Sequence, residues 1–333
     1  MKAAIAMPAR LAEATVPPER RGIARDAVRL LVTDRATRQH VHARFFELPA
    51  FLRAGDLLVV NDSATVPAAL RAQRLDGEPL LLHVATKLDQ RLWLAEPRAS
   101  VHGGERLRLP GGGSAVMLEP IEPLRPRVWY VRFDLPQPMH AFLAAHGEPI
   151  RYGYVTESLP LADFQTMFAT EPGSSEMPSA ARPFSQRVVS ALHARGVEIA
   201  ALTLHCGVSS FEAPERPTIE RYAVSFETAQ SVNRARRDGR RVIAIGTTTL
   251  RALESAKSGS QIVAAAGWTD LIIGESTSVT AADGLLTGFH DAGATHQWIL
   301  AAFLDRAIIA AAYAEAAEIG YCQHEFGDVH LIV

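Results

Sequence analysis

The alternation of buried strands and amphipathic helices after about His140 constrains the fold of this chain more than any other feature. The apolar runs VEIAALTLH, RVIAIG and WTDLIIG are typical of strands. Helical patterns alternate with these strands, at residues 183–196, at residues 226–239 and in TTTLRALESAK. The last segment, HQWILAAFLDRAIIAAAYAEAAEIG, is expected to form one long helix. Such alternation predicts a layered α/β domain with a largely parallel sheet.

Earlier in the chain, residues up to about Arg25 are rich in Pro, Arg and Ala and are expected to be an irregular lead-in. VRLLVTDR (28–35) and HVHARFFEL (40–48) then predict two strands around a polar turn. The segment LRAGDLLVVND (52–62) predicts a turn at Ala54-Gly55 and a strand buried on both faces, which stops at an Asn-Asp pair. We expect these strands to join the α/β domain.

From about Ala68 to Leu135 the pattern is different. Short β-rich runs such as PLLLHVAT, RLWLAEP and RVWYVRF recur every 10 to 15 residues and are separated by Gly, Pro and Asp turns. This spacing predicts a small antiparallel barrel or sandwich. The resulting fold class is a layered α/β catalytic domain formed by residues 1–62 and 150–333, with a small antiparallel β-barrel domain inserted at 63–149.

Composition limits what this two-domain protein does. The chain has 333 residues, 48% of them hydrophobic, and 34 Lys plus Arg against 36 Asp plus Glu, for a net charge of −2. A net charge near zero argues against a general nucleic-acid-binding field. Two distant cysteines indicate no disulfide framework, and no signal-like or membrane-spanning apolar run occurs. We expect a cytoplasmic monomer without membrane contact.

The phrase RVIAIGTTTLRALES (241–255) is the strongest local candidate for a binding site. Thr247, Thr248 and Thr249 follow a buried strand and open a helix, where hydroxyls and free amides bind a carboxylate or another anion. The alternative is that one Thr is an N-cap. Arg251, one turn further on, is either a substrate ligand or a partner of Glu254 or another neighbour in an ion pair.

TLHCGVSSFEAPE (203–215) is a second candidate, because a strand runs into His205, Cys206 and the pair Ser209 and Ser210 at the end where open α/β sheets bind ligands. A structural role for His205 is the alternative. Neighbouring residues on a strand point to opposite faces, so His205 is not expected to activate Cys206.

DGLLTGFHDAGATHQW (283–298) is a third candidate, with His290 in a glycine-rich loop before the last helix. His290 is interpreted as a ligand contact from this loop, and the alternative is that Thr295 only caps the helix. His290 and His296 lack the company of a metal motif such as HExxH. No GxGxxG, GxxxxGK[ST] or GxSxG occurs, which removes the main sequence support for Rossmann, P-loop and α/β-hydrolase functions.

Together these segments resemble one family, the S-adenosylmethionine:tRNA ribosyltransferase-isomerases of queuosine biosynthesis. The resemblance is carried from end to end, in matching order, by RLLVTDR, LRAGDLLVVNDSATVPAAL, DFQTMFATEPGSSEMPSAARPFS, TLHCGVSSF, RVIAIGTTTLRALES, DGLLTGFH and FGDVHLI. It implies an α/β domain with an inserted β-barrel, which agrees with the pattern of strands and helices.

The resemblance also implies a reaction. S-adenosylmethionine is the donor of a ribosyl group, and a 7-aminomethyl-7-deazaguanine base in a tRNA anticodon loop is the acceptor. Ribosyl transfer and isomerisation give epoxyqueuosine and release adenine and methionine, and no metal is implied. The catalytic candidates are His205 and His290. The substrate-binding candidates are Thr247, Thr248, Thr249, Arg251, Ser209, Ser210, Asp283 and Arg182.

Some positions depart from the family pattern. The phrase PSAARPF places Arg182 and Pro183 where the family carries Leu and His, and Ala64, Ala69 and Gly293 stand in place of arginines. Phosphate contacts depend on Lys and Arg, so the loss of these arginines predicts weaker binding of tRNA. Two alternatives stay open: a paralogue that uses S-adenosylmethionine on a small-molecule acceptor, and a catalytically silent protein that binds S-adenosylmethionine.

Overall fold

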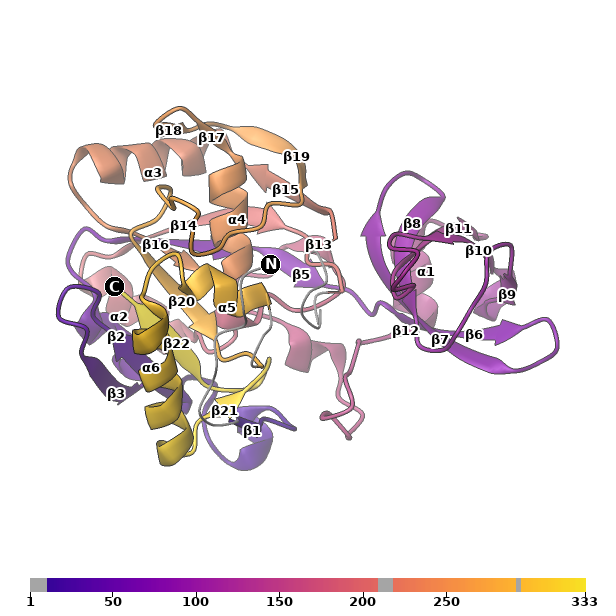
Figure 1. The fold of residues 1–333 in the computed structure, drawn as a ribbon, viewed down its shortest axis with the longest axis horizontal. Helices are drawn as coiled ribbons and strands as arrows, with labels where there is room; N and C mark the ends of the chain where they lie inside the picture. The colour runs from indigo at the N-terminus through magenta and orange to yellow at the C-terminus, as the bar shows by residue number, and fades with distance from the viewer. Residues whose placement is uncertain (1–10, 209–217, 292–294) are drawn as a thin grey trace.

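The computed structural model describes residues 11–208, 218–291 and 295–333. Two β structures dominate it, a large mixed sheet with helices on both faces and a barrel beside it (Figure 1). The expected fold class, α/β with a small antiparallel β-barrel, is confirmed.

The large sheet contains nine strands of the described residues. In spatial order they are β19 (Ala265–Thr269), β15 (Glu220–Val224), β14 (Glu198–Leu204), β4 (Leu57–Asn61), β16 (Val242–Ile245), β20 (Gly284–Gly288), β22 (Val329–Ile332), β2 (Arg29–Thr33) and β3 (His40–Arg44). The four central strands β14, β4, β16 and β20 are parallel neighbours. Antiparallel pairs flank them, and β22 pairs in parallel with β2, so the sheet is mixed and the expectation of a largely parallel sheet holds only in part.

Helices cover both faces of this sheet because its strands bury side chains on both sides. On one face α3 (Phe226–Arg237), α4 (Thr247–Ser255) and α6 (Arg306–Ile319) pack in a shared apolar core with Leu57 and Val59. On the other face α2 (Gln186–Ala194) packs with Leu58 and Val60. The alternation along β4 therefore places successive side chains in different cores.

The last helical segment differs from its prediction. α5 (Thr295–Leu300) and α6 are separate helices, so one continuous helix was wrong. Asp305 has an extended backbone, with φ −62° and ψ 145°, and precedes α6. Phe303 and Leu304 are buried at the break, so tertiary packing supports it. Similarly, only Trp268 and Thr269 of WTDLIIG lie in a strand, and HVHARFFEL continues from β3 into a 3₁₀ helix.

The barrel closes because β6 pairs with β7 on one side and with β9 on the other. Its ring runs through β6 (Ala69–Arg74), β7 (Pro79–Lys87), β8 (Leu92–Pro97), β11 (Trp129–Asp134), β10 (Ser114–Pro120) and β9 (Arg106–Arg108), and β12 (Gly147–Glu148) adds to β6. Helix α1 (Met139–His146) packs its Phe142 and Leu143 in the barrel core. The glycines at residues 103–104 and 111–113 lie in turns between the barrel strands, and Gly104, Gly111 and Gly112 have positive φ.

Shorter elements complete the described residues. The remaining strands are β1 (Ala12–Glu13) with β21 (Cys322–Gln323), β5 (Ser63–Thr65) with β13 (Glu171–Ser174), and β17 (Lys257–Ser258) with β18 (Gln261–Ile262). The 3₁₀ helices are η1 (Pro18–Arg21), η2 (Arg25–Ala27), η3 (Phe45–Phe51), η4 (Pro110–Gly112), η5 (Leu161–Phe164) and η6 (Ser179–Ala181). Strand β5 therefore pairs outside the barrel, and boundaries at 62/63 and 149/150 stay a prediction.

The outer side of the barrel packs against the α/β part. Ala85 and Leu94 share an apolar cluster with Ile150 and Val208. Ser175 donates a hydrogen bond from its hydroxyl to the carbonyl of Ala85 at 3.1 Å. Among the helices of the described ranges, none is both long and apolar enough to cross a membrane.

Candidate active site at the carboxyl edge of the sheet

The parallel centre of the sheet brings several of the predicted site residues to one edge. Strands β4, β14, β16 and β20 run in the same direction, so the residues that follow them meet at their carboxyl ends. Asn61 ends β4, His205 follows β14, Thr247 follows β16 and His290 follows β20. Open α/β sheets bind ligands at this edge.

Asn61 joins three of these segments. Its side-chain amide donates to the carbonyl of Leu204 at 2.8 Å and to the hydroxyl of Thr248 at 3.3 Å. Its side-chain oxygen accepts from the backbone N–H groups of Leu204 and Ser63, both at 3.0 Å. Because Asn61 is fully buried, its amide holds the ends of β4 and β14 in register with the start of α4.

His205 lies in a chain of hydroxyl groups. Its Nδ1 is 2.7 Å from the Ser63 hydroxyl, which is 2.6 Å from the Ser174 hydroxyl. A Cβ atom on Gly173 would lie 2.5 Å from Nδ1, so only glycine permits this approach. Burial, followed by the charges of Arg221 and His140, lowers the pKa of His205 to about 4. The imidazole is therefore neutral at pH 7 and able to accept a proton.

Cys206 faces away from His205, as the alternation of side chains predicts. Its thiol contacts the carbonyl of Leu204 at 3.8 Å, and its N–H donates to the Ser174 hydroxyl at 2.9 Å. Burial raises the pKa of this thiol far above its usual range. A buried thiol of this kind is a poor nucleophile.

The three threonines at the start of α4 have different environments. Gly246, with φ +96°, ends β16 and lets the chain turn into the helix. Thr247 and Thr248 carry first-turn N–H groups, which have no acceptor inside the helix. The hydroxyl of fully buried Thr249 donates to the carbonyl of Ile245 at 2.7 Å. Thr249 therefore uses its hydroxyl within the fold.

Arg251 forms its ion pair with Glu220 on β15, not with Glu254. Its Nε donates to the carbonyl of Leu271 at 3.0 Å. The other Glu220 oxygen accepts the N–H of Gly207 at 2.9 Å. The pair is buried and shapes the segment that follows His205.

His290 stacks on His296, with ring centroids 4.2 Å apart and ring planes 12° apart. Its Nε2 is 3.3 Å from the hydroxyl of Thr287. Burial, together with the charges of His296 and His324, lowers the pKa of His290 well below its usual value. The structure thus places a second neutral imidazole at this edge.

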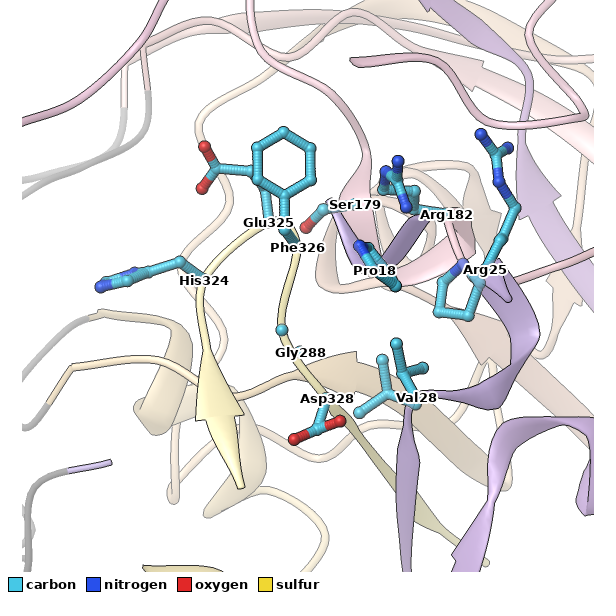
Figure 2. A pocket seen from close by; sticks show the side chains of 13 residues that line it. Pro18, Arg25, Val28, Ser179, Arg182, Gly288, His324, Glu325, Phe326 and Asp328 are labelled. Atoms are coloured by element: carbon cyan, nitrogen blue, oxygen red, sulfur yellow. The ribbon is translucent and has the colours of Figure 1, made fainter. Parts of the chain in front are cut away.

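Arg182 lines a narrow pocket beside the same edge (Figure 2). Its guanidinium donates to the Asp163 carbonyl at 3.0 Å and to Glu19 at 3.1 Å, and lies 5.1 Å from the Phe326 ring centroid. Glu325 accepts a 2.6 Å hydrogen bond from Tyr154. The other residues labelled in Figure 2 are Pro18, Arg25, Val28, Ser179, Gly288, His324 and Asp328, and Pro183 also lines the pocket.

The structure does not bring every predicted residue to this edge. Asp283 precedes β20 and accepts the N–H of Val242 at 2.8 Å, so it lies at the opposite end of the central strands. Ser209 and Ser210 lie outside the described residues. In the ranges that the structure describes, no three His, Cys, Asp or Glu side chains gather as a metal-binding group.

Several polar residues of the site were missed by the sequence analysis. Asn61 is the last residue of β4, and Ser63 follows the Asn61-Asp62 pair, which was interpreted only as a strand end. Ser174 sits in EPGSSEMP, and Glu220 is the first residue of β15. The abrupt change from the buried run LLVV to polar residues was the one available signal for Asn61 and Ser63, since buried polar residues need partners.

Comparisons with known proteins cover this chain almost completely. A family model described as "Queuosine biosynthesis protein" matches residues 6–332. The S-adenosylmethionine:tRNA ribosyltransferase-isomerase of Carboxydothermus hydrogenoformans is 34% identical over 320 residues, which cover 93% of this chain and 94% of that protein. The enzyme of the same name from Thermus thermophilus is 36% identical over 325 residues, with 93% of each chain covered.

A solved structure is also similar. The crystal structure of S-adenosylmethionine tRNA ribosyltransferase from Thermotoga maritima matches with a TM-score of 0.56 and 28% sequence identity. The match covers 99% of this chain and 99% of that one. The similarity therefore includes both the large sheet and the barrel.

Proposed function

Because the chain belongs to the family of S-adenosylmethionine:tRNA ribosyltransferase-isomerases, we propose that it transfers and isomerises the ribosyl group of S-adenosylmethionine onto a 7-aminomethyl-7-deazaguanine base of tRNA. The product is epoxyqueuosine, and adenine and methionine leave. The observation that carries this proposal is the match over residues 6–332, which includes all the segments that meet at the carboxyl edge.

The start of α4 suits the donor. The N–H groups of Thr247 and Thr248 and the hydroxyl of Thr248 supply donors for the methionine carboxylate. The positive end of the helix dipole adds to this attraction. Asn61 supports the arrangement because it holds the Thr248 hydroxyl at 3.3 Å.

His205 suits the first chemical step. The sulfonium acidifies the neighbouring 5′ carbon, and a neutral base removes a proton from it. When Nδ1 donates to the Ser63 hydroxyl, which donates in turn to Ser174, the Nε2 of His205 is left unprotonated as an acceptor. The acceptor amine then attacks C1′ and adenine leaves, after which epoxide closure expels methionine.

The His290–His296 stack supplies the other neutral imidazole. A neutral imidazole pair both accepts and donates hydrogen bonds, which suits ribose hydroxyls or the departing adenine. We assign His290 to substrate contact and proton handling because it follows β20 at the same edge as Thr247.

A direct assay tests this function. The purified protein is incubated with S-adenosylmethionine and tRNA that carries the aminomethyl base, and adenine, methionine and epoxyqueuosine are measured by mass spectrometry. Stoichiometric formation of all three supports the proposal. Turnover only with the free base would favour a small-molecule acceptor, and calorimetric binding of S-adenosylmethionine without turnover of either acceptor would favour a silent binding protein.

A further inference from the structure

A groove of about 460 Å³ opens on the sheet next to the candidate active site. It lies over β14, β15 and β19, and small side chains line it, namely Ala201, Ala223, Ala264 and Ala266. Leu202 and Val224 turn the other way into the core beneath α3 and α4. The groove is therefore on the face of these strands that the two helices leave uncovered.

Asp62 is the acidic residue of this groove. It is partly buried, and its carboxylate accepts a hydrogen bond from the hydroxyl of Thr203 at 2.7 Å. Within residues 11–208, 218–291 and 295–333, no Lys, Arg or His side chain forms an ion pair with it. Burial, and next the charge of Glu171, raise the pKa of Asp62.

Five buried carboxylates of the described residues each pair with an arginine, which Asp62 lacks. Asp26 pairs with Arg187, Asp56 with Arg241, Glu96 with Arg98, Glu105 with Arg74 and Glu220 with Arg251. A partly buried carboxylate without a cation is costly, since burial penalises the charged form. The Asp62 carboxylate is therefore available to form an ion pair, and the groove is open to a ligand that carries a positively charged group.

The groove leads to His205. Thr203 and His205 are two residues apart on β14 and its continuation, so their side chains lie on one face about 7 Å apart. Ser63, which follows Asp62 directly, bonds His205 at 2.7 Å. A ligand held by Asp62 therefore lies within reach of the base assigned to the first step.

Two exposed residues on the same face suit a nucleotide. Arg221 and Trp268 are cross-strand partners on β15 and β19, next to the pair Ala223 and Ala266. Trp268 is 41% exposed, which is unusual for so large an apolar ring. An exposed indole stacks on unpaired bases, and an exposed guanidinium contacts phosphate.

We propose that this groove binds the acceptor nucleotide and that the Asp62 carboxylate pairs with the protonated aminomethyl group of its base. The inference rests on the proposed function and deepens it, because it assigns the acceptor to a place distinct from the donor site at α4. The alanine lining accommodates a flat heterocycle, and Trp268 with Arg221 contacts the neighbouring nucleotides of the loop. Recognition depends on the positive charge of the acceptor amine.

The test compares two tRNAs that differ at one base, one with the aminomethyl base and one with guanine. Dissociation constants are measured by fluorescence anisotropy without S-adenosylmethionine, so that no turnover occurs. The wild type is expected to prefer the aminomethyl tRNA by about 10- to 100-fold, as a charged hydrogen bond implies. Asp62→Asn is expected to bind both tRNAs equally, within about 2-fold, because only the charge is lost.

The variant is expected to fold, because the asparagine oxygen still accepts the Thr203 hydroxyl. Glu171→Gln is the matched control: it removes a nearby exposed carboxylate and is expected to keep the preference within about 3-fold of wild type. Trp268→Ala is expected to weaken both tRNAs equally, by about 10-fold, through lost stacking.

Three results would overturn the inference. The first is a wild type that does not prefer the aminomethyl tRNA, and the second is an Asp62→Asn protein that keeps this preference. The third is an Asp62→Asn protein that no longer binds S-adenosylmethionine in calorimetry, because Asp62 would then hold the methionine ammonium of the donor. Release of adenine by the wild type is measured in parallel. A protein that turns over but shows no amine preference contradicts only the groove, whereas absence of turnover contradicts the proposed function.

Discussion

Strand β4 has an aspartate at each end, and the two have opposite environments. Asp56 at the amino end is 2% exposed and pairs with Arg241 through two hydrogen bonds, while the N–H of Arg53 donates to it at 2.7 Å. Asp62 at the carboxyl end is partly buried and has no such cation in the described ranges. Charges at the amino end are neutralised within the fold.

The same contrast extends to neighbouring strands. At the amino end Glu198 of β14 pairs with Arg240 at 2.8 Å. At the carboxyl end His205 and His290 have depressed pKa values and are neutral. The amino end of these strands is therefore closed by ion pairs, whereas the carboxyl end, besides the buried Arg251–Glu220 pair, presents neutral acceptors, free helix amides and the carboxylate of Asp62. Binding and proton transfer need groups whose interactions are incomplete in the free protein.

The largest effect is expected for a substitution at the amino end of β4. Asp56→Ala leaves Arg241 without its partner, and loss of one member of a buried pair costs about 3–5 kcal/mol. We expect the free energy of unfolding, measured by urea titration, to fall by about that amount. Asp62→Ala is expected to cost less than about 1 kcal/mol, since no ion pair is lost. Equal losses in the two variants would contradict the contrast between the two ends.

The next prediction concerns the carboxyl end. His205→Asn removes the proton acceptor and is expected to lower kcat by about 100-fold or more. Calorimetric binding of S-adenosylmethionine is expected to change little, because the donors of α4 are untouched. The control is His193→Asn, an exposed histidine on α2, for which we expect wild-type turnover. Retained turnover in His205→Asn would assign the base elsewhere, with His290 as the next residue to test.

A third prediction uses the neutral imidazoles. Burial lowers the pKa of His330 to about 3, against about 6.5 in an unfolded chain. Between these values the unfolded state binds more protons, so stability is complete above pH 6.5 and is lost as the pH falls towards 3. His330→Phe keeps the stacking on Phe289 and is expected to make this loss shallower by about 1.4 kcal/mol per pH unit.

The measurement is urea unfolding at several values between pH 6.5 and pH 4.5. His193→Phe is the matched control, because this histidine is exposed. If His330→Phe and wild type lose stability in parallel, His330 does not stay neutral in the folded protein.

The smallest expected effect separates two adjacent threonines. Thr249→Val removes the hydrogen bond to the Ile245 carbonyl and is expected to cost about 1 kcal/mol of stability without changing donor binding. Thr248→Val is expected to weaken S-adenosylmethionine binding by about 5- to 10-fold with stability almost intact. Thermal unfolding and calorimetry together would reveal a reversal of these roles.

Local sequence patterns were sufficient to predict most helices and strands and to predict that one part of the chain is α/β and the other a β-barrel. The period of the apolar residues predicted α2, α3 and α4 within a few residues, and turn residues predicted the short strands of the barrel. The pattern failed at α5 and α6, because the break at residues 301–305 is stabilised by burial of Phe303 and Leu304, which helical periodicity does not reveal. It also failed for strand direction, since pairing is decided by connections between distant segments.

The sequence by itself determined that a barrel accompanies an α/β sheet, and it identified His205, His290 and the α4 threonines as candidates, because strand ends and helix starts are local features. Only the tertiary structure decided what these groups contact. Asp283 lies at the opposite end of the central strands, and Arg251 forms an ion pair with Glu220. Ser63, Ser174 and His205 come from three separate segments and are linked by hydrogen bonds. Hydrogen bonds and burial between distant segments set the pKa values of these groups and decide which donors and acceptors stay available to a ligand. A local sequence pattern contains no information on such contacts.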